Sequence, residues 1–165
     1  MIRCGILRLV VPGVICLCAS NIVRADEVLK FRIVMHATST QTQDVGDVDG
    51  HTMSVSRFSG LALFPDGSVG TANFTFTGDY IKGTGTFLTY FNVTLKDGSA
   101  LWWKGTGQGK SNGTATVFPE FPISVLSGTG RFEGAKGDGS QTGERLTPLS
   151  SGADMYADVV INVKK

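Results

Sequence analysis

The stretch LALFPDGSVGTANFTF (residues 61–76) holds two runs of alternating apolar residues around Asp66-Gly67. Asp-Gly between alternating runs is a strong signal for a β-hairpin with a two-residue turn. Because opposed residues of a hairpin share a face, that turn predicts which side chains lie together. The predicted core face carries Leu61, Leu63, Ala72, Phe74 and Phe76.

A second hairpin is predicted in FLTYFNVTLKDGSALWWK (residues 87–104), around Asp97-Gly98. The same turn geometry predicts one face with Phe87, Phe91, Val93, Leu95, Trp102 and Lys104. The opposite face then carries Leu88, Tyr90, Asn92, Leu101 and Trp103. Exposed aromatic side chains in a group favour a subunit interface. We therefore expect Tyr90, Leu101 and Trp103 to support a homodimer or homotrimer.

Similar short runs rich in Val, Ile, Phe, Thr and Tyr recur along the chain, separated by turn residues. This pattern is typical of an all-β barrel or sandwich. The predicted strands are 28–36, 51–64, 69–79, 84–95, 99–109, 114–126, 138–146 and 153–163. Each strand with a clear pattern has one apolar face, which an eight-stranded antiparallel β-barrel would bury in its lumen. Such a lumen is filled by side chains or holds one small ligand.

The segment TSTQTQDVGDVDG (residues 38–50) has no apolar period, so it is expected to be a long polar loop. Its three aspartates hint at calcium, but their spacing is wrong for a helix-loop-helix calcium site. His36 and His51 flank the segment, and two histidines without a placed carboxylate make a poor metal site. We predict neither a metal nor a cofactor.

The N-terminal residues have the order of a secretory signal peptide. Arg3 and Arg8 come first, an apolar run follows, and Val23-Arg24-Ala25 has the small residues of a cleavage site. We therefore expect residues 1–25 to be a signal peptide and residues 26–165 to form one domain. All three cysteines lie in the predicted signal peptide. The prediction is a secreted or periplasmic protein that has no membrane segment once the signal is removed.

Charge and motifs exclude several function classes. The formal charge of +1 gives no field that would attract nucleic acid, so no nucleic-acid partner is expected. The glycines at 128 and 130 are not followed by a helical pattern or a Walker sequence, which argues against a nucleotide loop. No Gly-x-Ser-x-Gly sequence supports a nucleophile, so the catalytic residues are unknown.

One motif resembles a known family. Residues 123–137 read ISVLSGTGRFEGAKG, a strand, a glycine turn and one helical turn. In it Gly128, Gly130, Phe132, Gly134, Ala135 and Gly137 match the allene oxide cyclase and dirigent barrel superfamily. A second stretch, Gly78-Asp79-Tyr80 with Phe87-Leu88-Thr89-Tyr90, looks like the allene oxide cyclase segment upstream of that motif. The resemblance implies an eight-stranded antiparallel barrel with an apolar cavity, often in dimers or trimers. Phe132 and Ala135 would close one barrel end.

Plant cyclases carry a Glu and an Asn where this chain reads HATST (residues 36–40), so the resemblance does not extend to their catalytic residues.

The predicted site combines two cations with an aromatic lumen. Lys104 and Arg57 have the parity of apolar neighbours and would orient a polar head group, unless a bulge at Ser59-Gly60 or Gly105 turns them outward. The side chains expected to shape the cavity are Phe74, Phe76, Phe91 and Trp102. The first hypothesis is a barrel that binds a small apolar or amphiphilic molecule. If it is an enzyme, it guides a cyclisation or coupling as an isomerase-like barrel without cofactor. The alternative is a non-enzymatic exported protein with a filled lumen, acting through its surface or oligomer.

Overall fold

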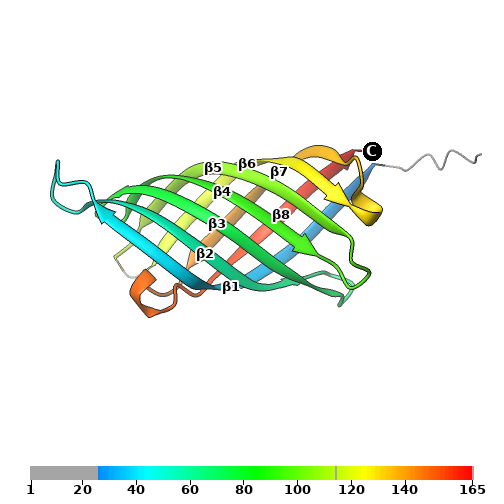
Figure 1. Cartoon of the computed structure of the whole chain (residues 1–165), viewed down its shortest axis with the longest axis horizontal. Helices are drawn as coiled ribbons and strands as arrows, with labels where there is room; N and C mark the ends of the chain where they lie inside the picture. The colour runs from blue at the N-terminus through cyan, green and yellow to red at the C-terminus, as the bar shows by residue number, and fades with distance from the viewer. Residues whose placement is uncertain (1–25, 114, 165) are drawn as a thin grey trace, which may run out of the picture.

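The chain forms a closed barrel of eight antiparallel strands in a computed structural model that describes residues 26–113 and 115–164 (Figure 1). The strands are β1 (Glu27–Asp44), β2 (His51–Leu63), β3 (Val69–Ile81), β4 (Thr84–Thr94), β5 (Ala100–Ser111), β6 (Thr116–Thr129), β7 (Lys136–Arg145) and β8 (Met155–Lys164). Two short 3-10 helices, η1 (Gly130–Phe132) and η2 (Leu149–Ser151), lie at opposite ends. Each strand pairs with its sequence neighbours, and β1 pairs with β8 to close the barrel. The predicted fold class is therefore confirmed. The predicted signal peptide, residues 1–25, lies outside the described residues.

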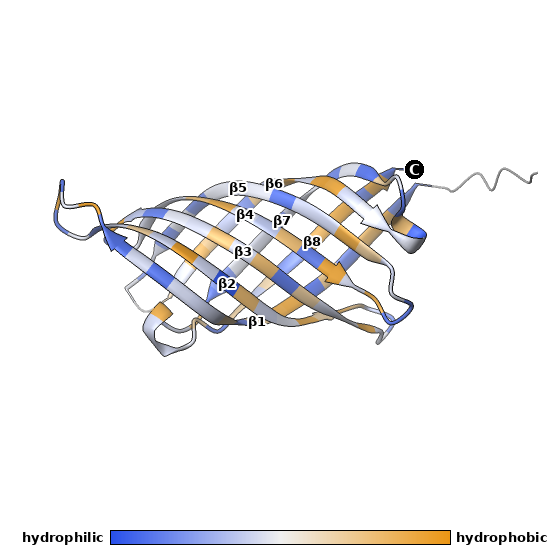
Figure 2. Cartoon of the chain, in the orientation of Figure 1, coloured by the Kyte–Doolittle hydropathy of each residue, from blue (hydrophilic) through white to orange (hydrophobic). Residues whose placement is uncertain are grey.

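Hydrophobic and hydrophilic residues alternate along the strands, as the banding in Figure 2 shows, and the apolar residues of one face are buried in the lumen. The first and last strands show this alternation, with Phe31 and Ile33 buried on β1 and Val159 and Ile161 on β8. Phe132 is also buried, and it packs against Gly128, where an added Cβ would lie 2.3 Å from the Phe132 carbonyl oxygen. Phe132 and Ala135, which were predicted to close one barrel end, are both buried.

The predicted loop over residues 38–50 is partly wrong, because β1 continues to Asp44. Beyond a bulge at Thr38, Ser39 to Asp44 pair with Arg57 to Thr52 of β2. Most of these β1 side chains are exposed, and this part of β1 (Figure 1, cyan) lies beyond the pairing with β8, which ends at Met35. The residues of β2 that are buried opposite it, Ser54 and Ser56, are polar, so this part of the hairpin shows no apolar period in the sequence.

Both predicted hairpins form, but their loops have three residues instead of two. Phe64 donates its N–H to the Ser68 carbonyl (3.0 Å), and Leu95 donates to Ser99 (2.9 Å). Gly67 and Gly98 each have φ of 81°, the left-handed conformation of a three-residue hairpin loop with a glycine bulge. One extra loop residue shifts the register by one, which moves the side chains of one strand to the other face.

The register shift corrects the predicted faces of β2 and β5. Ala62 and Phe58 are buried, whereas Leu61 and Leu63 are exposed. On β5 the buried residues are Leu101 and Trp103, and Trp102 and Lys104 point outward. The predicted exposed group therefore loses Leu101 and Trp103, and Tyr90 alone of the three is exposed, at 48%.

Candidate functional site in the lumen

Two walls of aromatic side chains line the middle of the lumen. In the first wall, Phe58 stacks on Phe74 with ring centroids 4.2 Å apart, and Phe74 stacks on Phe91 at 4.5 Å. Phe91 in turn lies parallel to Trp103 at 5.3 Å. The row comes from neighbouring strands, because Phe58, Phe74 and Phe91 are directly paired across β2, β3 and β4.

The second wall is built around Phe87. Phe118 and Phe121 meet Phe87 edge to face, at 5.4 Å and 4.9 Å between centroids. Phe76 lies 5.8 Å from Phe87 in a nearly parallel orientation. Such stacked and edge-to-face pairs add stability beyond the area that they bury.

A cavity of about 20 Å³ remains between the walls. That space suffices for about one water molecule. Its other lining residues lie toward the end of the barrel that holds the β7–β8 loop, where Arg145, Leu149 and Met155 contribute. The side chains of the chain thus nearly fill the lumen.

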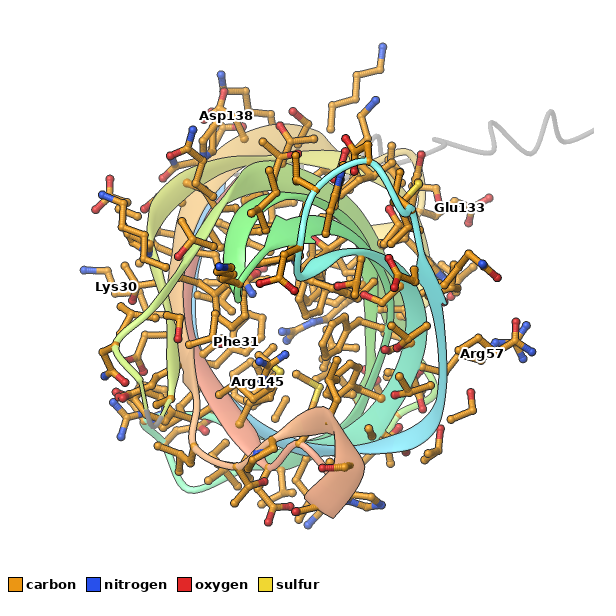
Figure 3. The ribbon with its side chains drawn as sticks, turned by 90° about the vertical axis from the view of Figure 1, so that its left-hand side faces the viewer. Lys30, Phe31, Arg57, Glu133, Asp138 and Arg145 are labelled. Atoms are coloured by element: carbon orange, nitrogen blue, oxygen red, sulfur yellow. The ribbon has the colours of Figure 1, made fainter. Side chains whose placement is uncertain are left out.

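Arg145 is the charged residue that lines this cavity. The end view in Figure 3 shows its side chain inside the ring of strands, together with Phe31. Arg145 is half-buried, and Nη2 donates a hydrogen bond to Thr116 Oγ1 (2.8 Å). Within the described chain no carboxylate lies within ion-pair distance of it. Burial lowers the pKa of Arg145, and the nearby Tyr80 partly offsets that effect.

Tyr80 is a second polar group without full compensation. Its hydroxyl is buried and has no hydrogen-bond partner among the described residues. The hydroxyl lies against β5, where a Cβ added to Gly109 would meet Tyr80 Oη at 2.5 Å. Burial raises the pKa of Tyr80 well above its usual value, and the charge of Arg145 opposes this rise. A buried polar group without a partner destabilises the fold, so such a group points to a ligand or a functional role.

The structure divides the predicted site residues between the two faces of the barrel. Phe74, Phe76 and Phe91 line the lumenal cavity as expected. Trp102, Arg57 and Lys104 lie on the outer face instead, and Figure 3 shows Arg57 outside the ring of strands. The predicted lumenal position of both cations is wrong for one reason, the three-residue hairpin loops.

Sequence reasoning missed Arg145. It has the parity of Gln141 and Gly143 on β7, and it pairs with Met155, whose side chain is buried. The nine-residue connection between Arg145 and Met155 gives no turn signal that would fix this register.

A second group of titratable residues lies where the β1–β2 loop meets the end of β3. His51 Nδ1 is 2.5 Å from Asp47 Oδ1, and Nε2 is 2.7 Å from Asp79 Oδ1. These hydrogen bonds, led by the one to Asp79, raise the pKa of His51. The histidine therefore ties the β1–β2 loop to β3. Among residues 26–113 and 115–164 no cluster of His, Cys, Asp and Glu has the arrangement of a metal site.

Neither short helix among the described residues has the length and apolar character needed to cross a membrane.

Comparison with known proteins finds structural similarity at low sequence identity. No family model matches the chain, and no curated protein matches it. A conserved protein of unknown function from Rhodopseudomonas palustris is similar in structure, with a TM-score of 0.53 and 11% identity over 86% of this chain and 99% of that chain. A pterocarpan synthase dirigent protein gives a TM-score of 0.49 with 13% identity over 93% of this chain and all of that chain. Pyocyanin demethylase gives 0.46 with 12% identity over 82% and 100%. The likeness to the Rhodopseudomonas palustris protein concerns the fold alone.

Proposed function

We propose that the lumen binds a small apolar or amphiphilic molecule with an anionic group, which Arg145 anchors. The observation that carries this proposal is a half-buried guanidinium in an aromatic cavity with no carboxylate beside it. Burying a cation is costly unless an opposite charge or several hydrogen bonds compensate. An anionic ligand would supply that compensation, and a planar carboxylate matches the fork of the guanidinium.

The aromatic walls favour a flat apolar body for this ligand. Phe58, Phe74 and Phe91 present stacked rings on one side, and the rings around Phe87 stand on the other. A planar ring system inserted between them would make the same stacked and edge-to-face contacts that the walls make with each other.

Ligand entry requires side chains to move, because the cavity measures only about 20 Å³. Met155 and Leu149 stand beside Arg145 in the lining, and methionine repacks easily because it is unbranched and flexible. We propose that these two side chains swing aside when the ligand enters.

Any catalysis by this lumen would rest on orientation. The described residues that line the cavity include no Asp, Glu or His. A bound molecule held in one conformer would favour one cyclisation or coupling product without acid–base chemistry from the protein.

A second function is favoured by the small cavity itself. A barrel whose side chains fill the lumen would act through its surface, as an exported structural or interaction protein. Export through cleavage after residue 25 and assembly into a homodimer or homotrimer belong to either proposal. N-terminal sequencing and the solution mass of the protein purified from its source would test them.

Isothermal titration with 2-naphthoate and 2-naphthol tests the proposed anchor. The two probes share a ring system and differ in charge, so 2-naphthoate is expected to bind at least tenfold more tightly. An Arg145→Met variant should lose that preference, whereas Lys110→Met, which removes an exposed cation of β5, should keep it. Equal binding of both probes would contradict the anchor, and binding of neither would favour the filled barrel.

A further inference from the structure

The outer face of the barrel carries a groove of about 430 Å³ that runs across β1 to β6. Its outward-facing lining is polar and aromatic apart from one leucine: Thr38, Arg57, Asn73, Thr75, Tyr90, Asn92, Trp102 and Leu126. Two of the residues expected in the lumen, Arg57 and Trp102, are therefore brought together here, on the opposite side of the sheet.

Strand pairing arranges these side chains in two adjacent rows. Direct cross-strand pairs make the first row, Arg57, Thr75, Tyr90 and Lys104, on β2 to β5. The next row consists of Asn73, Asn92 and Trp102, on β3 to β5. Each row follows the direction across the strands, so a ligand in the groove would lie across the sheet.

The groove has positive charge without a compensating acid. Arg57 lines the groove, and Lys104 stands beside it, directly paired with Tyr90. Both cations are exposed, and within the described chain neither has a carboxylate at ion-pair distance. They stand at the two ends of the first row, three strand spacings apart, or about 14 Å along the surface. An extended ligand with repeated anionic groups can pair with both cations at once.

The side chains between the two cations fit sugar rings. Tyr90 is 48% exposed, and Trp102 lies diagonally beside it on the neighbouring strand. Aromatic rings present a flat apolar face with a polar edge, which suits the apolar face of a pyranose. The amides of Asn73 and Asn92 both donate and accept hydrogen bonds, as neighbouring hydroxyl groups require.

We propose that this outer groove binds an acidic oligosaccharide, a short chain of uronic acid units. Tyr90 and Trp102 stack on the sugar rings, and the two asparagines bond the hydroxyl groups. Arg57 and Lys104 each pair with a carboxylate of the chain. This site is separate from the lumen, so its failure or success leaves the lumenal proposal untouched.

Titration of the ¹⁵N-labelled protein with trigalacturonic acid tests the proposal, with the fully methyl-esterified trimer as the matched neutral probe. The acid should shift the amide signals of β3, β4 and β5 around the groove, and its affinity should exceed that of the ester at least tenfold. Tyr90→Ala, an exposed position, and the double variant Arg57→Ala/Lys104→Ala should each weaken binding at least tenfold. Lys110→Ala, on the same strand as Lys104 but outside both rows, should change it less than twofold.

Three results would overturn the proposal. Equal binding of the acid and the ester would remove the role of the cations. Unchanged affinity in Tyr90→Ala, with a wild-type spectrum, would remove the stacking. Selective binding of a single-stranded thymidine oligonucleotide in place of the uronide would assign the groove to nucleic acid.

Discussion

The two halves of the lumen are built from the same alternating strands, but they differ in how completely their polar groups are paired. In the half near η1, Trp103 is fully buried and its indole N–H donates to Gln141 Oε1 (3.2 Å). In the half near η2, Arg145 has no carboxylate partner within the described chain, and the Tyr80 hydroxyl has no partner there. The first half is organised for stability, whereas the second retains groups that lower it, as functional sites often do.

The largest loss of stability is expected in the half near η1, where the buried polar groups are paired. Trp103→Ala would remove a stacked, fully buried side chain and leave Gln141 without its donor, so unfolding free energy should fall by about 3–5 kcal/mol. Urea denaturation followed by circular dichroism measures this loss. A loss below about 1 kcal/mol would mean that this half is loosely packed.

Arg145→Met, in the half near η2, should not lower the stability of the protein. It removes an uncompensated cation, so the stability of the ligand-free protein should be unchanged or about 1 kcal/mol higher. Affinity for an aromatic carboxylate should fall about a hundredfold, as expected for a desolvated charged contact. Denaturation and calorimetry of the same preparation give both values. A large loss of stability would show that Arg145 is a structural residue and that the two halves do not differ in the way described.

Tyr80→Phe tests the same difference between the two halves of the lumen by removing a single oxygen atom. The change deletes a buried hydroxyl that lacks a partner, so the free energy of unfolding should rise by about 1 kcal/mol. Thermal unfolding of the ligand-free protein checks the sign. A destabilised Tyr80→Phe protein would indicate that the hydroxyl is bonded in solution, to water for example.

The His51 cluster predicts a pH dependence at the rim of the less well-paired half. Its hydrogen bonds to Asp79 and Asp47 raise the pKa of His51 above the ordinary 6.5. A group whose pKa is raised by folding stabilises the fold fully below its unfolded pKa, and this contribution is lost as pH rises through the folded pKa. Hydrogen exchange of residues 45–50 should therefore be slow near pH 6 and faster at pH 9, after correction for the intrinsic rate. His51→Gln should abolish the change, and His36→Gln, an exposed position, should preserve it.

The smallest effect is expected from Lys104→Met and Arg57→Met. Both side chains lie outside the barrel, so the affinity of the lumen for 2-naphthoate should stay within twofold of the wild-type value. A calorimetric titration of each variant measures this. A tenfold loss in either variant would contradict the observed register and restore the original placement of these cations.

The sequence predicted the barrel because alternation along β1, β3, β4 and β8 is unambiguous. It failed at β2 and β5 because Asp-Gly occurs both in two-residue turns and in three-residue loops. In the structure the Asp66 and Asp97 carboxylates accept the N–H of the serine two residues later, which stabilises the longer loop. A difference of one loop residue then exchanged the inner and outer faces.

The same limit applies to the site residues, because the sequence predicted three aromatic side chains of the lumen but not its cation, Arg145. Phe74, Phe76 and Phe91 were predicted in the lumen because their strands alternate without interruption. Arg145 was missed because a nine-residue connection separates it from Met155, so no local signal fixes its face. A long connection leaves the register of its flanking strands undetermined by local sequence, and Arg145 lies directly before one.

Native mass spectrometry of the protein purified from its own source, beside the Arg145→Met variant, tests the central claim most directly. We expect the wild-type chain to carry one small molecule, which denaturation releases as an anion, and the variant to carry none. A wild-type chain without bound mass, whose melting temperature no aromatic carboxylate raises, would contradict a ligand site at Arg145 and support a filled lumen.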